Sequence, residues 1–97
     1  MLIRAVGPTL SGFGVTGALA DPRLAVYAGP TLHALNDDWG GGAVLTDIFT
    51  RVGAFALPAG SRDSAILLPL APGAYTVHVE GATAAPGSVL LELYEVP

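Results

Sequence analysis

GAYTVHVEG (residues 73–81) is the stretch that decides the fold of this chain. Its apolar residues Tyr75, Val77 and Val79 alternate with the polar residues Thr76, His78 and Glu80. Strict alternation is typical of a β-strand with one buried face and one wet face. The stretch therefore predicts a half-buried strand.

SVLLELYEV (88–96) repeats this pattern near the end of the chain. Alternation predicts that Val89, Leu91 and Leu93 point inward, whereas Leu90, Glu92 and Tyr94 point outward. The small-residue segment GATAAPG separates the two stretches. We therefore expect them to form an antiparallel pair joined by a loose loop.

The upstream sequence contains further short strand candidates. Gly29 and Pro30 predict a tight reversal between two of them, and Pro69 predicts that another runs at a sheet edge or ends there. The candidates are LIRAV (2–6), RLAVYA (23–28), TLHALN (31–36) and SAILLPL (64–70). Short strands with frequent Gly and Pro between them favour a small sandwich.

One segment has helical spacing. In VLTDIFTRVG (44–53), Leu45, Ile48, Phe49 and Val52 recur at i, i+3, i+4 and i+7, and Gly53 is placed to end the helix. Two or three turns are not stable alone, so this helix must pack on the sheet. The sequence predicts one all-β domain over 1–97, a small antiparallel β-sandwich of jelly-roll type with one short helix at about 44–52.

Composition excludes several function classes. The 97 residues are 52% hydrophobic and 12% charged, with four arginines, no lysine, no cysteine and a net charge of −4. Scattered arginines on an acidic chain argue against nucleic-acid binding. No apolar run reaches the ~18 residues of a membrane span, so we expect no membrane insertion. Without cysteine there is neither a disulfide framework nor thiol chemistry.

NDDWGGG (36–42) is the segment richest in candidate ligands. Calcium prefers carboxylate and carbonyl oxygens, which makes Asn36, Asp37 and Asp38 a possible calcium site, the only cofactor we consider. The segment nevertheless lacks alternating D-x-D-x-D spacing. The competing interpretation, which we favour, is a structural turn, with Asp38 capping the helix and Trp39 covering the core.

Catalytic and sugar-binding patterns are weak. We expect no catalytic residue, because His33 and His78 lie outside any nucleophile motif and Ser61 lies in a polar loop. Exposed rings stack on sugars, and Trp39, Tyr27 and Tyr94 are the candidates for a glycan-binding face. The alternative, which we favour, is that these rings cover the sheet or a subunit contact.

The polar loop AGSRDS (59–64) is predicted to be exposed to solvent. We expect Arg62 and Asp63 to pair with each other or with water at the surface. Exposed ion pairs of this kind contribute only ~0–1 kcal/mol to stability.

The order of several phrases resembles a known module. The phrases are LIRAVGPTL (2–10), FGVTGALADPRLAVY (13–27), NDDW (36–39), GAFALPAGSRDSAILLPLAPGAYTVHVEG (53–81) and LLELYEVP (90–97). In layout they are similar to bacterial pre-peptidase C-terminal domains, in which a GxYTVxV strand follows a turn and an Asn-Asp pair follows a strand hairpin. The resemblance implies a non-catalytic β-sandwich accessory module, often in tandem, of large secreted or cell-surface bacterial proteins.

The resemblance has one departure. In such modules the LIRAVGP strand is usually preceded by a further strand-like segment, whereas this chain begins at Met1. Either the missing strand leaves an open sheet edge that invites pairing with another chain, or the domain does not need that segment.

The low charge carries the functional expectation. Twelve charged residues must solubilise a chain that is half hydrophobic, so some outward positions such as Leu90, Ala25 and Leu32 are expected to be apolar. Exposed apolar patches mark contacts with other proteins. We expect an extracellular or cell-surface structural module that forms homo-oligomers or filaments or packs on sister modules, with a glycan- or calcium-binding accessory module as the alternative.

Overall fold

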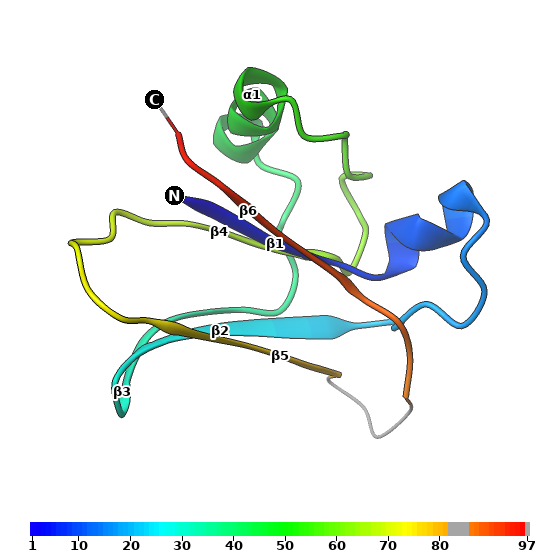
Figure 1. Ribbon diagram of the computed structural model, residues 1–97. Helices are drawn as coiled ribbons and strands as arrows, with labels where there is room; N and C mark the ends of the chain where they lie inside the picture. The colour runs from blue at the N-terminus through cyan, green and yellow to red at the C-terminus, as the bar shows by residue number, and fades with distance from the viewer. Residues whose placement is uncertain (82–85, 97) are drawn as a thin grey trace.

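The computed structural model describes residues 1–81 and 86–96 (Figure 1). The described residues form six strands, one α-helix and one 3-10 helix. The strands are β1 (Leu2–Val6), β2 (Pro22–Ala28), β3 (Thr31–Asn36), β4 (Ser64–Leu67), β5 (Thr76–Gly81) and β6 (Leu90–Tyr94). The helices are η1 (Pro8–Phe13) and α1 (Ala43–Val52).

The strands form two three-stranded antiparallel sheets, in the orders β4-β1-β6 and β3-β2-β5. The sheets face each other, so the predicted all-β sandwich with one short helix is confirmed. The β2–β3 hairpin turns at Gly29, whose φ of 59° is readily adopted only by glycine. The predicted reversal at Gly29-Pro30 is therefore confirmed.

The apolar core has two parts, one on each side of the sheet β4-β1-β6. Between the sheets, Ile3 and Ala5 of β1 pack with Leu24 and Val26 of β2. On the other side, Leu2 packs with residues of α1 and of the segment that follows it, among them Ile48, Phe49 and Leu57. Figure 1 shows α1 on one side of this sheet and β2, β3 and β5 on the other. Both faces of β1 are covered, which explains why all five of its residues are buried.

Helix α1 confirms the helical prediction. Ile48 and Phe49 are buried, and Gly53 ends the helix with a left-handed φ of 77°. The prediction that Asp38 caps this helix was wrong. Gly42 is the N-cap, and no side chain caps the first turn.

The two alternating stretches at the end of the chain do not pair with each other. Strand β5 pairs with β2, and β6 pairs with β1 in the other sheet. The expected β5–β6 hairpin was therefore wrong. Neighbouring strands in a sandwich often belong to different sheets, and alternation alone does not identify the partner.

The alternation of β6 was predicted correctly, but the prediction of which face is buried was wrong. Glu92 and Tyr94 point toward the α1 side and are largely covered, whereas Leu91 and Leu93 are 39% and 54% exposed. Strand β6 is an edge strand, and its α1-side face lies under a third layer. The face expected to be wet is therefore the better covered one.

Candidate functional site

The NDDW segment closes the outer edge of β4. Oδ1 of Asn36 accepts a hydrogen bond from the Ala65 backbone N–H at 3.0 Å, and Nδ2 of Asn36 donates to the carbonyl of Asp38 at 3.1 Å. The Trp39 backbone N–H donates to the carbonyl of Asp63 at 3.0 Å. Residues 36–39 thus satisfy one backbone group of β4 and one of Asp63, just before it.

Trp39 is a core residue, as predicted for a lid. It is 6% exposed and packs against Phe49 with ring centroids 5.2 Å apart. Its indole N–H lies 3.0 Å from the carbonyl of Pro58 and 3.2 Å from Oγ of Ser61. At Gly41, φ is 71° and a Cβ would lie 2.7 Å from the carbonyl oxygen of Ala59, so only glycine fits there. These contacts describe a tightly packed corner.

Three carboxylates meet beside this corner. Oxygens of Asp21, Asp37 and Asp38 lie within 4.8 Å of one another. Burial raises the pKa of Asp21, and a hydrogen bond to Asp37 and the charges of Asp37 and Asp38 raise it further, while Arg62, 3.8 Å away, opposes them. Burial is the main cause of this shift, and the close approach of the three carboxylates adds a smaller electrostatic contribution that a cation or a proton would relieve.

The predicted calcium ligands are only partly brought together. Asp37 and Asp38 are in the cluster, but Asn36 uses its side chain for hydrogen bonds to Ala65 and Asp38. Asp21 takes the third place, and sequence reasoning missed it because it lies far upstream before Pro22. Three oxygen donors fit a hard cation such as calcium, although a full calcium shell takes about 6–8 oxygens.

The three rings considered for glycan binding do not share a face. Trp39 is buried in the core, and Tyr94 faces the α1 side, where its hydroxyl donates to Glu92. Tyr27 is half-buried on β2, with its ring 4.9 Å from that of His78. Of the three, only Tyr27 lies on the outer face of the sheet β3-β2-β5.

The histidines and Ser61 are placed apart from one another. His78 contacts Tyr27, and His33 stacks on Tyr75 with ring centroids 6.0 Å apart. Oγ of Ser61 donates to Oδ2 of Asp63 at 2.6 Å. Within residues 1–81 and 86–96, no hydrogen bond or ion pair joins either histidine to Asp37 or Ser61.

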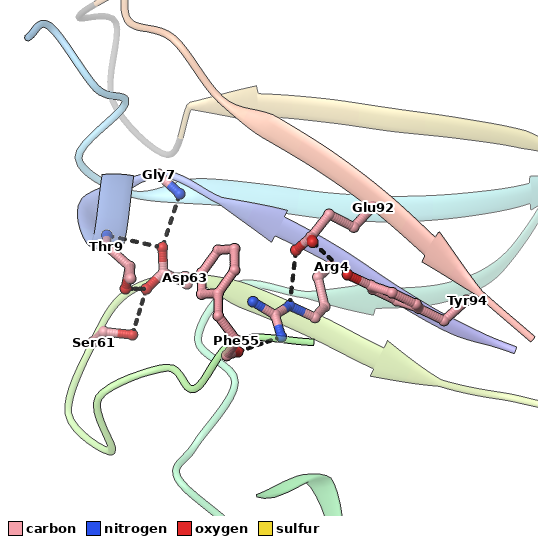
Figure 2. Close-up of polar contacts among 8 residues, drawn as sticks. All are labelled: Arg4, Gly7, Thr9, Phe55, Ser61, Asp63, Glu92 and Tyr94. Carbon is pink, nitrogen blue, oxygen red and sulfur yellow. Dashed lines mark hydrogen bonds and ion pairs between the residues drawn. The ribbon is translucent and has the colours of Figure 1, made fainter. Parts of the chain in front are cut away.

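Asp63 is a polar residue whose environment differs from the one expected from the sequence. The prediction of an exposed Arg62–Asp63 pair was wrong, because Asp63 is fully buried. Its Oδ1 accepts from the backbone N–H of Gly7 at 2.8 Å and of Thr9 at 3.3 Å. Its Oδ2 accepts from the hydroxyls of Thr9 and Ser61 (Figure 2). The carboxylate joins the end of β1 and the start of η1 to the loop before β4.

A second buried polar group lies in the same layer. The Arg4 side chain is fully buried between the rings of Phe49 and Phe55, each 4.6 Å from its guanidinium carbon. Its Nε lies 3.1 Å from Oε1 of Glu92, and Nη1 donates to the carbonyl of Phe55 at 2.8 Å (Figure 2). Burial lowers the pKa of Arg4, and the charge of Glu92 partly restores it. The hydrogen bond to Glu92 is the main cause of the raised pKa of Tyr94.

One small apolar pocket lies beside α1. It encloses about 60 Å³ and is lined by Thr46, Phe49, Thr50, Ala54, Ala56 and Leu57. Pockets that bind metabolites typically enclose roughly 300–1,000 Å³. This pocket therefore has room for a few water molecules but not for a metabolite.

Comparison with known protein families, with curated proteins and with solved structures found no match for this chain. Among the described residues, no helix is long and apolar enough to cross a membrane.

Proposed function

We propose that this chain is a non-catalytic structural module of an extracellular bacterial protein, which associates with copies of itself or with neighbouring modules through apolar sheet faces and edge strands. Its buried polar groups support this role. Asp63 and the Arg4–Glu92 pair hold loops and layers together. These buried polar groups therefore have a structural role.

The single observation that carries the proposal is the exposure of leucines on two separate surfaces. On the outer face of the sheet β3-β2-β5, Leu32 and Leu35 are 48% and 55% exposed. The strand register places Leu32 beside Tyr27 and Leu35 beside Ala25. On the other sheet, Leu91 and Leu93 are exposed along β6. Contiguous apolar surface on a chain with so little charge supports a role in protein contacts.

The boundary of the first surface also fits a contact. Arg23 and Glu80 form an ion pair of 2.9 Å at one end of the outer face. Apolar centres with polar rims are typical of interfaces between proteins.

Light scattering coupled to size-exclusion chromatography tests the proposal on the whole chain. We expect a mass above that of the monomer that rises with concentration in the micromolar range. Leu35→Lys should reduce association if the outer face takes part, with Val44→Lys on the exposed side of α1 as the matched control. A monomer at every concentration would remove the proposal.

The second candidate is a module stabilised by calcium, and the cluster of Asp21, Asp37 and Asp38 is the observation that favours it. Burial is the main cause of the raised pKa of Asp21, and a cation would relieve the smaller contribution that the charges of Asp37 and Asp38 add. Calcium should then raise the melting temperature of the wild type but not of Asp21→Asn. Equal melting temperatures with calcium and with EDTA would eliminate this candidate.

A further inference from the structure

The free edge of β6 exposes both backbone and side chains. The Ala65 N–H points away from β1, because it donates to Asn36. Ala65 is opposite Arg4, and Arg4 is opposite Glu92. Since backbone groups alternate sides along antiparallel strands, Glu92 turns its N–H and C=O toward β1, whereas Leu91 and Leu93 turn theirs to the open edge.

Among the residues that the structure describes, nothing covers the side chains of the same two leucines. They share a face with Ile3 and Ala5, their partners in β1, yet they are 39% and 54% exposed. In the strand order β4-β1-β6, β6 is at one border of its sheet (Figure 1), with β1 on one side and, among the described residues, no strand on the other. An added strand would satisfy the backbone groups and cover the leucines at once.

Strand β6 also lacks a charge that would discourage pairing. Its only charged residue, Glu92, points to the opposite face, where it is held by Arg4 and Tyr94. At the opposite edge of the sheet, Asn36 accepts from the Ala65 N–H of β4, and the Trp39 N–H donates to the carbonyl of Asp63 just before β4. In the other sheet, whose edge strands are β3 and β5, β5 presents alternating exposed polar residues. Edge strands are usually protected by charge or by cover, and the part of the chain that the structure describes supplies neither to the Leu91 and Leu93 face within β6.

We propose that β6 pairs with β6 of a second copy of this chain, antiparallel about a two-fold axis at Leu91, to form a continuous six-stranded sheet. This inference rests on the proposed function and specifies its interface. In this register Leu91 is opposite Leu91 of the second copy, and Val89 is opposite Leu93. Glu92 is opposite Leu90.

The register follows from charge and polarity. An axis at Glu92 would place two carboxylates opposite each other, which destabilises a strand pair. An axis at Leu93 would place Glu95 opposite Leu91, on the apolar face. Only the axis at Leu91 places apolar residues opposite one another along the whole exposed face without opposing like charges.

Because the chain has no cysteine, single-cysteine variants test this register directly. Across a hydrogen-bonded antiparallel pair the Cα atoms are about 5.5 Å apart, within the range of about 4.4–6.8 Å that a disulfide spans. We expect Leu91→Cys to form a covalent dimer under mild oxidation. Leu93→Cys alone should not, because its two copies would be about 14 Å apart, four residues along the strand.

A mixture of Val89→Cys and Leu93→Cys gives a second test of the register. The proposal predicts disulfides only between the two different variants, which isotope labelling of one variant and mass spectrometry distinguish. The control is Val44→Cys, on the exposed side of α1. Leu91→Cys that cross-links no faster than Val44→Cys, or Leu93→Cys that cross-links to itself, would overturn the register.

Charge substitution tests the edge itself. Leu91→Lys with Leu93→Lys should abolish the dimer in light scattering and leave the circular dichroism spectrum unchanged, because both positions are already exposed. If the wild type associates but these lysines do not weaken it, the β6 interface is wrong and the proposed function stands. If the wild type never associates, both fail.

Discussion

Removal of the Asp63 carboxylate should be the most damaging single change at a polar residue of this protein. Asp63 is fully buried and accepts four hydrogen bonds from Gly7, Thr9 and Ser61. A hydrogen bond to a charged group contributes about 1.5–3 kcal/mol, and a buried donor left without a partner costs about 1–3 kcal/mol.

The magnitude for Asp63→Ala follows from which donors can find another partner. The hydroxyls of Thr9 and Ser61 are on half-buried residues and can turn toward water, but the Gly7 N–H is buried and cannot. The Gly7 N–H is left without a partner, and the other hydrogen bonds to Asp63 are lost and only partly replaced by water. Together these losses should lower the free energy of unfolding by about 4 kcal/mol. For a domain of this size that corresponds to a fall in melting temperature of roughly 15–30 °C.

Asp63→Asn separates shape from charge. It keeps an oxygen for the N–H groups of Gly7 and Thr9 but presents an amide to the two hydroxyls, so we expect a loss of about 1–2 kcal/mol. Asp47→Asn on the exposed side of α1 is the control, with an expected change within about 0.5 kcal/mol.

Urea unfolding followed by the fluorescence of Trp39, the only tryptophan, provides the assay. That indole is buried and contacts Ser61, next to the carboxylate in question. Our reasoning would be refuted if Asp63→Ala and Asp47→Asn unfolded at the same urea concentration.

Three further predictions concern the remaining charged groups. Arg4→Met should lower the free energy of unfolding by about 3 kcal/mol, because it leaves Glu92 largely buried without its partner. Adding Glu92→Gln should recover part of this loss. If the two substitutions had strictly additive effects on urea unfolding, the two side chains would not be coupled. The folded-state pKa of Tyr94 is raised above 10.0, so the folded state keeps its proton at higher pH than the unfolded state does. Wild-type stability should therefore fall as pH rises above 10.0. In unfolding experiments across alkaline pH, the stability of Tyr94→Phe should lack this dependence on pH. The pKa of Asp21 is raised above 3.8, so wild-type stability should fall as pH rises through the window above that value. Asp21→Asn should therefore be more stable relative to the wild type at neutral pH than at pH below 3.8, and a difference independent of pH would exclude this cause.

The elements were predictable because their signals are local. The alternation in β5 and the helical spacing in α1 depend only on residues a few positions apart in the sequence, and both were confirmed. Gly29 predicted its turn because only its own φ mattered. Pairing was not predictable in this way, since β5 and β6 meet partners from distant parts of the chain.

The candidate site was predictable only in part, for the same reason. Asp37 and Asp38 are neighbours in sequence and drew attention at once, but Asp21 joins them only when β2 and the 36–39 corner come together. Asn36 looked like a ligand by type, yet its position beside the β4 edge makes it a hydrogen-bond partner for backbone.

The sequence by itself determined the period of each segment, the absence of cysteine chemistry and the scarcity of charge, because these are properties of residues taken in order. Only the tertiary structure decided which polar residues are buried and which leucines are exposed. The sequence predicts Asp63 at the surface of a loop, yet it is fully buried, and it predicts Leu93 in the core, yet this residue is half exposed. The physical reason is that burial depends on what packs over a face: α1 and its flanking segment cover one side of β6, and the described residues place nothing over the other side at its edge.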